Sequence, residues 1–400
     1  MEHLGSIVET GGGAGPWMAL VLVAFLTGSH LDGALATESE RAHRRARWLG
    51  LLALFLTAVA GVALAWGSPL SETRRWQEAA VWWAPSVIVL WMGAWSARVG
   101  AAGSTSRLAA VQAVPAILLQ LAPPLGWNLG GALLAGVARL GVPPLQPLHL
   151  AAADTLSLGT LVLLLVLSFA LGAPPALSSA EAAGGSPAWI ASLLALATGA
   201  IGVASLRDFS LPRRLAVWAS TQASLALLVT WILAEEGRPA ATHGLRHAAA
   251  SAAALPLLGF AFGGVLRWLR TDDLRAFGGL LTEARFRAAA LLAVAFTAPL
   301  LSAGAAGTLA ALGLSEGLLW FPRMAVVAAL VGWLGANLSL ALAAYRISRG
   351  RRPAPGAPIP ELRPREVGVL VLLLAFALWV LVTKDFGLAP TAWPAMEAGS

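Results

Sequence analysis

The sequence repeats one pattern from end to end: an apolar run of about 20 residues followed by a short polar stretch. A helix of that length crosses the hydrocarbon core of a bilayer. A β-barrel is disfavoured because the apolar residues form continuous runs and do not alternate. We therefore predict an all-α fold, a polytopic transmembrane helical bundle. About twelve spans are expected, at 16–35, 48–66, 79–97, 108–124, 126–148, 155–172, 188–206, 215–234, 248–268, 287–312, 321–345 and 366–384.

The spans leave no room for a soluble domain. Hydrophobic residues make up 58% of the chain and charged residues 12%, whereas a soluble domain carries about 25% charged residues. We predict that residues 1–400 form one transmembrane domain. The longest polar stretch, 346–365, is rich in proline and is expected to be a stiff cytoplasmic linker before a last span at 366–384.

The arginines lie between the apolar runs, and with twelve spans most Arg-rich loops fall on one side of the membrane. The positive-inside rule makes that side cytoplasmic, so both termini are predicted to be non-cytoplasmic. The opposite loops, 173–187 and 235–246, are nearly charge-balanced. The net charge of +7 is thus explained by contact with a lipid bilayer, and we expect no nucleic-acid partner.

Cysteine is absent, which excludes disulfides, thiolate-bound iron–sulfur clusters and cysteine–zinc sites. The sequence also shows no haem, flavin or nicotinamide motif. We expect no cofactor in this chain, and any role in an oxidoreductase or translocase complex would be that of a non-catalytic subunit.

Two of the predicted spans are interrupted. The stretch GVPPLQPLHLAAAD (141–154) contains Pro143, Pro144 and Pro147, and the span 287–312 contains SAGAAG with Gly304 and Gly307. Broken helices at corresponding places in two halves of a membrane protein point to an ion pathway. The alternative is that proline and glycine only kink these helices.

Ionisable groups inside spans are costly and therefore mark candidate functional sites. His149 and Asp154 follow the first break, five residues apart, and His243 and His247 lie four residues apart on one helix face. Histidine can carry a proton near neutral pH, so these four residues are the candidate proton relay. Neighbouring charged or polar residues that could support it are Arg139, Arg213, Gln146 and Gln222.

Two other interpretations of the histidine pair stay open. Two histidines at this spacing can share a metal, but metal sites normally have three or four ligands, and no other cluster supplies them; we expect no metal. Alternatively, His243 and His247 could simply lie at the membrane interface and donate to carbonyl groups.

The motif at the first break resembles one in a known family. VPPLQPLHLAAADT is similar to K-A-P-L-F-P-L-H-x-W-L-P-D-A of the antiporter-like membrane subunits of respiratory complex I, membrane-bound hydrogenases and multisubunit cation/proton antiporters. Three further stretches follow in the family's order: LRDFSLPRRLAVWAST (206–221), HGLRHAAAS (243–251) and RTDDLRAFGGLLTEARFRAAALL (270–292). The matches cover about residues 139–312, and an antiporter-like core at about 108–345 is implied.

The chain also departs from the family in the residues that are thought to carry protons there. Val142 and Ser251 stand where the family has lysines, and the span 155–172 contains no lysine. The segment 87–96, where the family has a glutamate, contains no acid. Arginine could not replace a pumping lysine, because it does not deprotonate in proteins.

The resemblance implies a subunit of a complex that translocates protons or monovalent cations, in an inner (plasma) membrane of bacterial or archaeal type. Its partners would be other membrane subunits and a soluble cytoplasmic protein. Because of the missing lysines, we expect a reduced relay. A non-pumping scaffold subunit and an unrelated polytopic transporter are the alternatives, and a quinone-site subunit, suggested by 172–185, ranks last.

Overall fold

The computed structural model describes residues 14–33, 41–66, 80–88, 102–121, 128–235, 237, 240–269, 273–276, 278–304, 307, 320–349 and 360–382. These residues are almost entirely helical, and the β-structure among them is one isolated bridge between Ser210 and Asp273. The all-α prediction is therefore confirmed.

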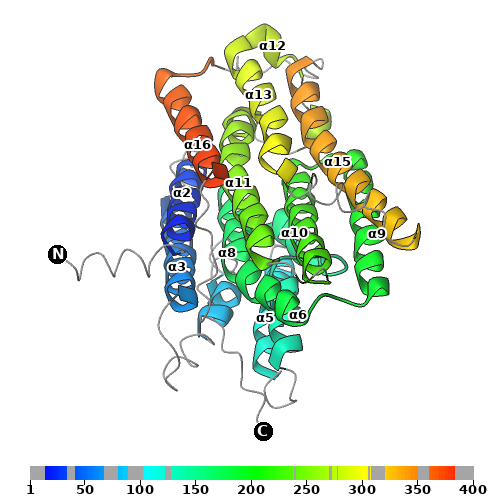
Figure 1. Cartoon of the computed structure of the whole chain (residues 1–400). Coiled ribbons are helices and arrows are strands. Elements are labelled where there is room, and N and C mark those ends of the chain that lie inside the picture. The colour runs from blue at the N-terminus through cyan, green and yellow to red at the C-terminus, as the bar shows by residue number, and fades with distance from the viewer. Residues whose placement is uncertain are drawn as a thin grey trace, which may run out of the picture.

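The long helices run side by side as a bundle (Figure 1). Six of them are long and apolar enough to cross a membrane, so the chain is a multi-pass membrane protein. The helices are α2 (Ala14–Gly33), α3 (Arg41–Trp66), α5 (Ala102–Leu121), α6 (Asn128–Arg139), α7 (Pro147–Thr155), α8 (Leu158–Ala182), α9 (Ala188–Ala204), α10 (Leu211–Glu235), α11 (Ala241–Leu269), α12 (Leu280–Glu283), α13 (Arg285–Leu301), α15 (Trp320–Arg349) and α16 (Pro364–Val382), with 3₁₀ turns η3 (Ser205–Arg207) and η4 (Leu274–Ala276). Residues 80–88 are also helical.

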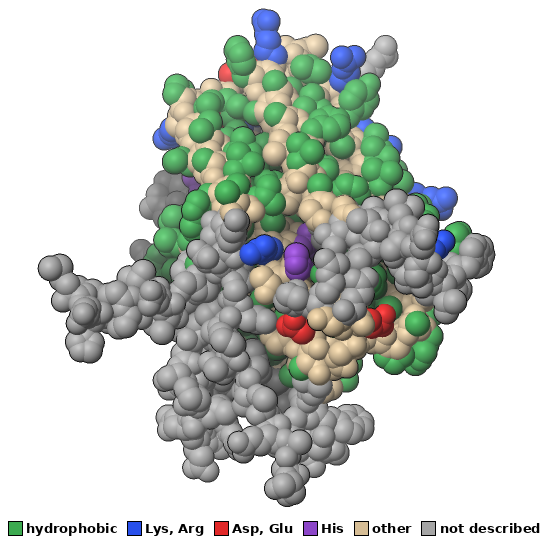
Figure 2. Space-filling model, in the orientation of Figure 1, with side chains coloured by type: hydrophobic (Ala, Val, Ile, Leu, Met, Phe, Trp, Pro, Cys, Tyr) green, Lys and Arg blue, Asp and Glu red, His purple; other side chains and the backbone are tan. Residues whose placement is uncertain are grey.

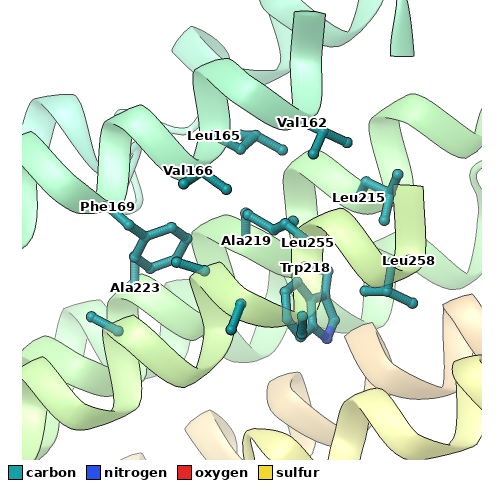
Figure 3. Close-up of a cluster of buried hydrophobic side chains, with 14 of the residues drawn as sticks. Val162, Leu165, Val166, Phe169, Leu215, Trp218, Ala219, Ala223, Leu255 and Leu258 are labelled. Atoms are coloured by element: carbon teal, nitrogen blue, oxygen red, sulfur yellow. The ribbon is translucent and has the colours of Figure 1, made fainter. Parts of the chain in front are cut away.

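Helices α8, α10 and α11 form the centre of the bundle. The apolar windows of these helices are 100%, 94% and 89% buried, respectively. A helix that is apolar all round needs apolar neighbours on every side, and α8 meets this need by packing against α2, α3, α6, α10 and α11. Figure 3 shows Phe169 and Val166 of α8 close to Ala219 of α10, whereas the Trp218 side chain points away from them and donates to Asn337 of α15 at 2.9 Å.

The outer helices present apolar side chains to the surroundings. Trp189 of α9, Phe296 of α13, Leu334 of α15 and Val382 of α16 are all more than half exposed. Hydrophobic side chains cover much of the visible face of the molecule, and several basic side chains stand at its upper end (Figure 2). This distribution suits a lipid-facing belt with a charged end.

The first predicted break is present. Helix α6 ends at Arg139, residues 140–146 form turns, and α7 begins at Pro147. The second span ends its regular helix at Leu301, and Ser302 lies in a turn. Gly304 and Gly307 are helical, and most of the remainder of 287–312 lies outside the described residues.

Some predicted boundaries were wrong. The loop expected at 173–187 is helical as far as Ala182, with Pro174 and Pro175 inside α8. Proline is tolerated in membrane helices because neighbouring groups satisfy the backbone that it frees, and α8 is packed on all sides. The linker expected at 346–365 is also shorter, because α15 continues to Arg349 and α16 begins at Pro364.

Candidate functional site

The turn between α6 and α7 places His149 inside the protein. Gly141 in this turn has φ +61°, and a Cβ atom built on it would collide with the His149 ring. Glycine is therefore required both by its backbone conformation and by its close approach to the imidazole. Pro143–Pro144 is a cis peptide, and Pro147 is at the start of α7.

His149 is buried and has a contact at each ring nitrogen. Its Nε2 lies 3.3 Å from the carbonyl oxygen of Arg139, and its Nδ1 lies 3.3 Å from the Ser220 hydroxyl. Because a carbonyl only accepts, Nε2 carries the hydrogen, and in the neutral ring Nδ1 accepts from Ser220. His149 therefore links the end of α6 to the middle of α10.

Asp154 does not share this site. It is exposed and forms a two-pronged ion pair with Arg213, with N–O distances of 2.5 and 2.7 Å. Five residues of helix turn the Asp154 side chain to a different face of α7 from His149. The structure thus separates the two groups that stand close in sequence.

Arg139, at the end of α6, is buried with neutral partners. It donates from Nη1 to Gln112 Oε1 at 3.1 Å and from Nη2 to the Trp82 carbonyl at 2.6 Å. Its guanidinium carbon also lies 5.2 Å from the centre of the Trp82 ring, a cation–π arrangement. Within the described part of the chain, the Arg139 Nε has no hydrogen-bond partner.

His243 and His247 lie in the first two turns of α11. His243 is exposed, whereas His247 is 6% exposed. The His247 ring interacts with the backbone of Gln222 in α10, and its Nε2 has no hydrogen-bond partner. The pair therefore runs from the surface into the interior of the bundle.

One turn of α10, Ser220 to Gln222, lies between the two buried histidines. Its Ser220 side chain contacts His149, and its Gln222 backbone contacts His247. Both amide atoms of Gln222 and the hydroxyl of Thr221 are buried without a partner, and Ser251, one turn after His247, is in the same state. We call His149, Ser220, Thr221, Gln222, His247 and Ser251 the polar row.

Buried polar atoms are normally hydrogen-bonded to protein or to ordered water. A concentration of partnerless atoms along two facing central helices is therefore suited to binding water molecules. Gln146, in the turn of the break, also has a buried partnerless Oε1 atom. Among the described residues, no three His, Asp or Glu side chains come together as a metal site would require.

Arg214 was not singled out from the sequence, although its neighbour Arg213 was. Arg214 is fully buried and donates to backbone carbonyls of Asp208 and Leu206 and to that of Ser339 in α15. Two adjacent arginines at a helix start give no sequence signal for which one turns inward.

The exposed loops beside this end of α10 carry cation–aromatic contacts. The guanidinium carbons of Arg275 and Arg346 lie 5.1 and 5.8 Å from the centre of the Phe209 ring. Hydrogen bonds from the Arg275 side chain and backbone lower the pKa of Asp273.

Known proteins match this chain in structure but not in sequence. No protein-family model matches the chain, and no curated protein sequence matches it. Solved structures do match. A chain of respiratory complex I from Thermus thermophilus with bound NADH has a TM-score of 0.65 at 16% identity, covering 95% of this chain and 83% of that one. The chain has the antiporter-like fold.

Two further structures agree. A chain of Thermus thermophilus respiratory complex I with bound aureothin gives a TM-score of 0.62 at 16% identity, covering 92% of this chain and 84% of that chain. A chain of the Mrp complex from Dietzia sp. DQ12-45-1b gives 0.62 at 15% identity, covering 94% and 84%. The antiporter-like fold thus extends over nearly the whole chain, beyond the stretches that carry the motifs.

Proposed function

We propose that this chain is a membrane subunit of a multisubunit complex that translocates protons or monovalent cations, and that it contributes a reduced proton relay. The first part of this proposal, membership of such a complex, is supported by the fold that the chain shares with chains of complex I and the Mrp complex. The observation that supports the relay is that one turn of α10 contacts both buried histidines.

In this proposal the relay begins at exposed His243 and continues through His247 to His149 along the polar row. Imidazoles can accept and release protons near neutral pH, and water held by the partnerless side chains would connect them. Asp154 is a weaker candidate than its sequence position indicated, because Arg213 occupies both of its oxygens.

The test is to reconstitute the full chain with its copurifying subunits in liposomes and to measure proton movement during turnover of the complex. We expect His247→Ala and His149→Ala each to reduce proton movement by roughly tenfold or more, since a positioned proton-transfer group contributes about 10²–10⁴-fold. His30→Ala is the matched control, because His30 stacks on Phe260 outside the polar row. Unchanged coupling in both variants, with assembly intact, would refute the relay.

A second candidate is a non-pumping scaffold subunit, favoured by Val142 and Ser251 at the positions where the resemblance implies lysines. Under that hypothesis, deleting the chain disassembles the complex, while substitutions in the polar row leave proton movement unchanged. Robust, uncoupler-sensitive proton flux through the chain would exclude the scaffold.

A further inference from the structure

Arg139 places a permanent positive charge at the helix break, because a guanidinium does not deprotonate in proteins. The residue is 2% exposed. Its oxygen partners, Gln112 Oε1 and the Trp82 carbonyl, are both neutral dipoles, and its Nε has no hydrogen-bond partner among the described residues. Such partners stabilise the guanidinium but leave its net charge uncancelled.

No carboxylate on neighbouring sequence offsets this charge. The sequence has no Asp or Glu between Glu78 and Asp154, a stretch that includes α5, α6 and the turn of the break. Asp154 itself is paired with Arg213 at the surface. Within the part of the chain that the structure describes, Arg139 forms no ion pair. An uncompensated charge is rare inside a membrane and usually functional.

We propose that Arg139 is a charge lock that closes the relay at the helix break; this inference rests on the proposed function. His149 directs its Nε2 to the carbonyl oxygen of Arg139. The His149 ring also lies within electrostatic range of the Arg139 side chain. An excess proton on His149 would add a second positive charge near a permanent one, in a medium that screens charges poorly. Protons can exchange along the polar row, but without turnover of the complex they do not pass the break toward α5 and α6.

The position of Arg139 explains why arginine suits this role. Val142, buried at 1% exposure, stands where the resemblance implies a lysine, and Arg139 lies three residues earlier, at the end of α6. A lysine could release its proton and let charge move on, whereas arginine keeps its charge. The chain thus retains a cation near that place without the ability to pass a proton through it.

The decisive variant is Gln112→Glu. It changes side-chain volume little and puts a carboxylate where Oε1 already lies 3.1 Å from Arg139 Nη1. In liposomes holding the full chain with its copurified subunits, a valinomycin-imposed potassium diffusion potential drives passive proton flux, read by an internal pH dye. We expect this flux to rise roughly tenfold, as a barrier lowered by about 1.4 kcal/mol would allow. Arg139→Gln should act in the same direction.

The controls are the same substitutions at exposed positions. Gln120→Glu introduces a carboxylate at an exposed position of α5, and Arg207→Gln removes an exposed arginine outside the relay; neither should raise the flux. Adding His149→Ala to Gln112→Glu should return the flux to the wild-type level, because the extra protons pass through His149.

The outcomes separate the lock from the relay. The lock is refuted if assembled Gln112→Glu keeps the wild-type flux, or if its extra flux survives His149→Ala. Gln112→Glu alone decides the matter should Arg139→Gln fail to assemble. The relay has its own readout, since unchanged turnover-linked proton movement in His247→Ala and His149→Ala counts against the proposed function whatever the passive flux does.

Discussion

At the scale of single residues, Arg214 binds three segments together. It donates to carbonyls of the loop between α9 and α10 and to Ser339 of α15. We predict that Arg214→Ala destabilises the protein by about 3–5 kcal/mol, because a hydrogen bond to a charged group is worth roughly 1.5–3 kcal/mol and buried carbonyls lose their donor. Thermal unfolding in detergent, followed by size-exclusion chromatography, measures the change.

Arg213→Ala is the matched control for this prediction. Its ion pair with Asp154 is 46% and 41% exposed on the two sides, so its loss should cost no more than about 1 kcal/mol. Equal destabilisation by the two variants would contradict the role given to Arg214.

For single residues, the sequence predicted which groups are buried better than it predicted their partners. Hydropathy and spacing placed His149 and His247 in or beside spans, and both are buried. The same reasoning wrongly grouped Asp154 with His149. Each residue step on a helix rotates the side chain by about 100°, and only tertiary packing fixes which face is inward. Arg139 was named from sequence, but its contact with Trp82 depends on a distant segment.

At the scale of elements, α9 and α15 pack most closely of the helices described, with glycine backbones in direct contact. A Cβ atom on Gly202 would overlap the backbone of Gly332, and one on Gly335 would meet that of Gly202. Small residues allow such approach between membrane helices, where packing drives association. Glycine here serves the helix interface rather than a turn.

We therefore predict that Gly202→Ala destabilises the protein by roughly 1–3 kcal/mol, the usual cost of overpacking. Gly368→Ala on α16 is the matched control: its Cβ would meet nothing within 4 Å, so the higher helix propensity of alanine should leave stability unchanged or up to about 1 kcal/mol higher. The melting temperatures of both variants in detergent give the comparison. A Gly202→Ala protein as stable as wild type would show that α9 can move away without loss.

Helix existence was predictable from sequence, and helix ends were not. Runs of apolar residues located α9 and α10 to within a few residues, because the thickness of the bilayer sets the length of the apolar run that a spanning helix needs. The end predicted at residue 172 was too early, because α8 continues through Pro174 and Pro175 to Ala182. The local cost of the prolines is offset by packing that the sequence does not display. The break at 140–146 was predicted because prolines and polar residues coincide there.

At the scale of the whole molecule, the central helices give the bundle two chemically different ends. At one end the Glu181 carboxylate accepts from the Ala240 backbone amide, joining the end of α8 to the start of α11. At the other, Arg346 of α15 stacks on Phe209 beside the start of α10. Several described arginines lie at that end, so from the positive-inside rule we predict that it faces the cytoplasm. In that predicted orientation, exposed His243 would lie on the opposite, non-cytoplasmic side.

This orientation can be tested directly because the chain has no native cysteine. Ala183→Cys lies just after α8 and Arg349→Cys lies at the end of α15, both at exposed positions on opposite ends of the bundle. A membrane-impermeant maleimide should label Ala183→Cys in intact cells or right-side-out vesicles, and Arg349→Cys only in inverted ones. The reversed pattern would place exposed His243, where the proposed relay begins, on the cytoplasmic side. Labelling of both cysteines from one side would contradict the arrangement of α8 and α15 across the bilayer.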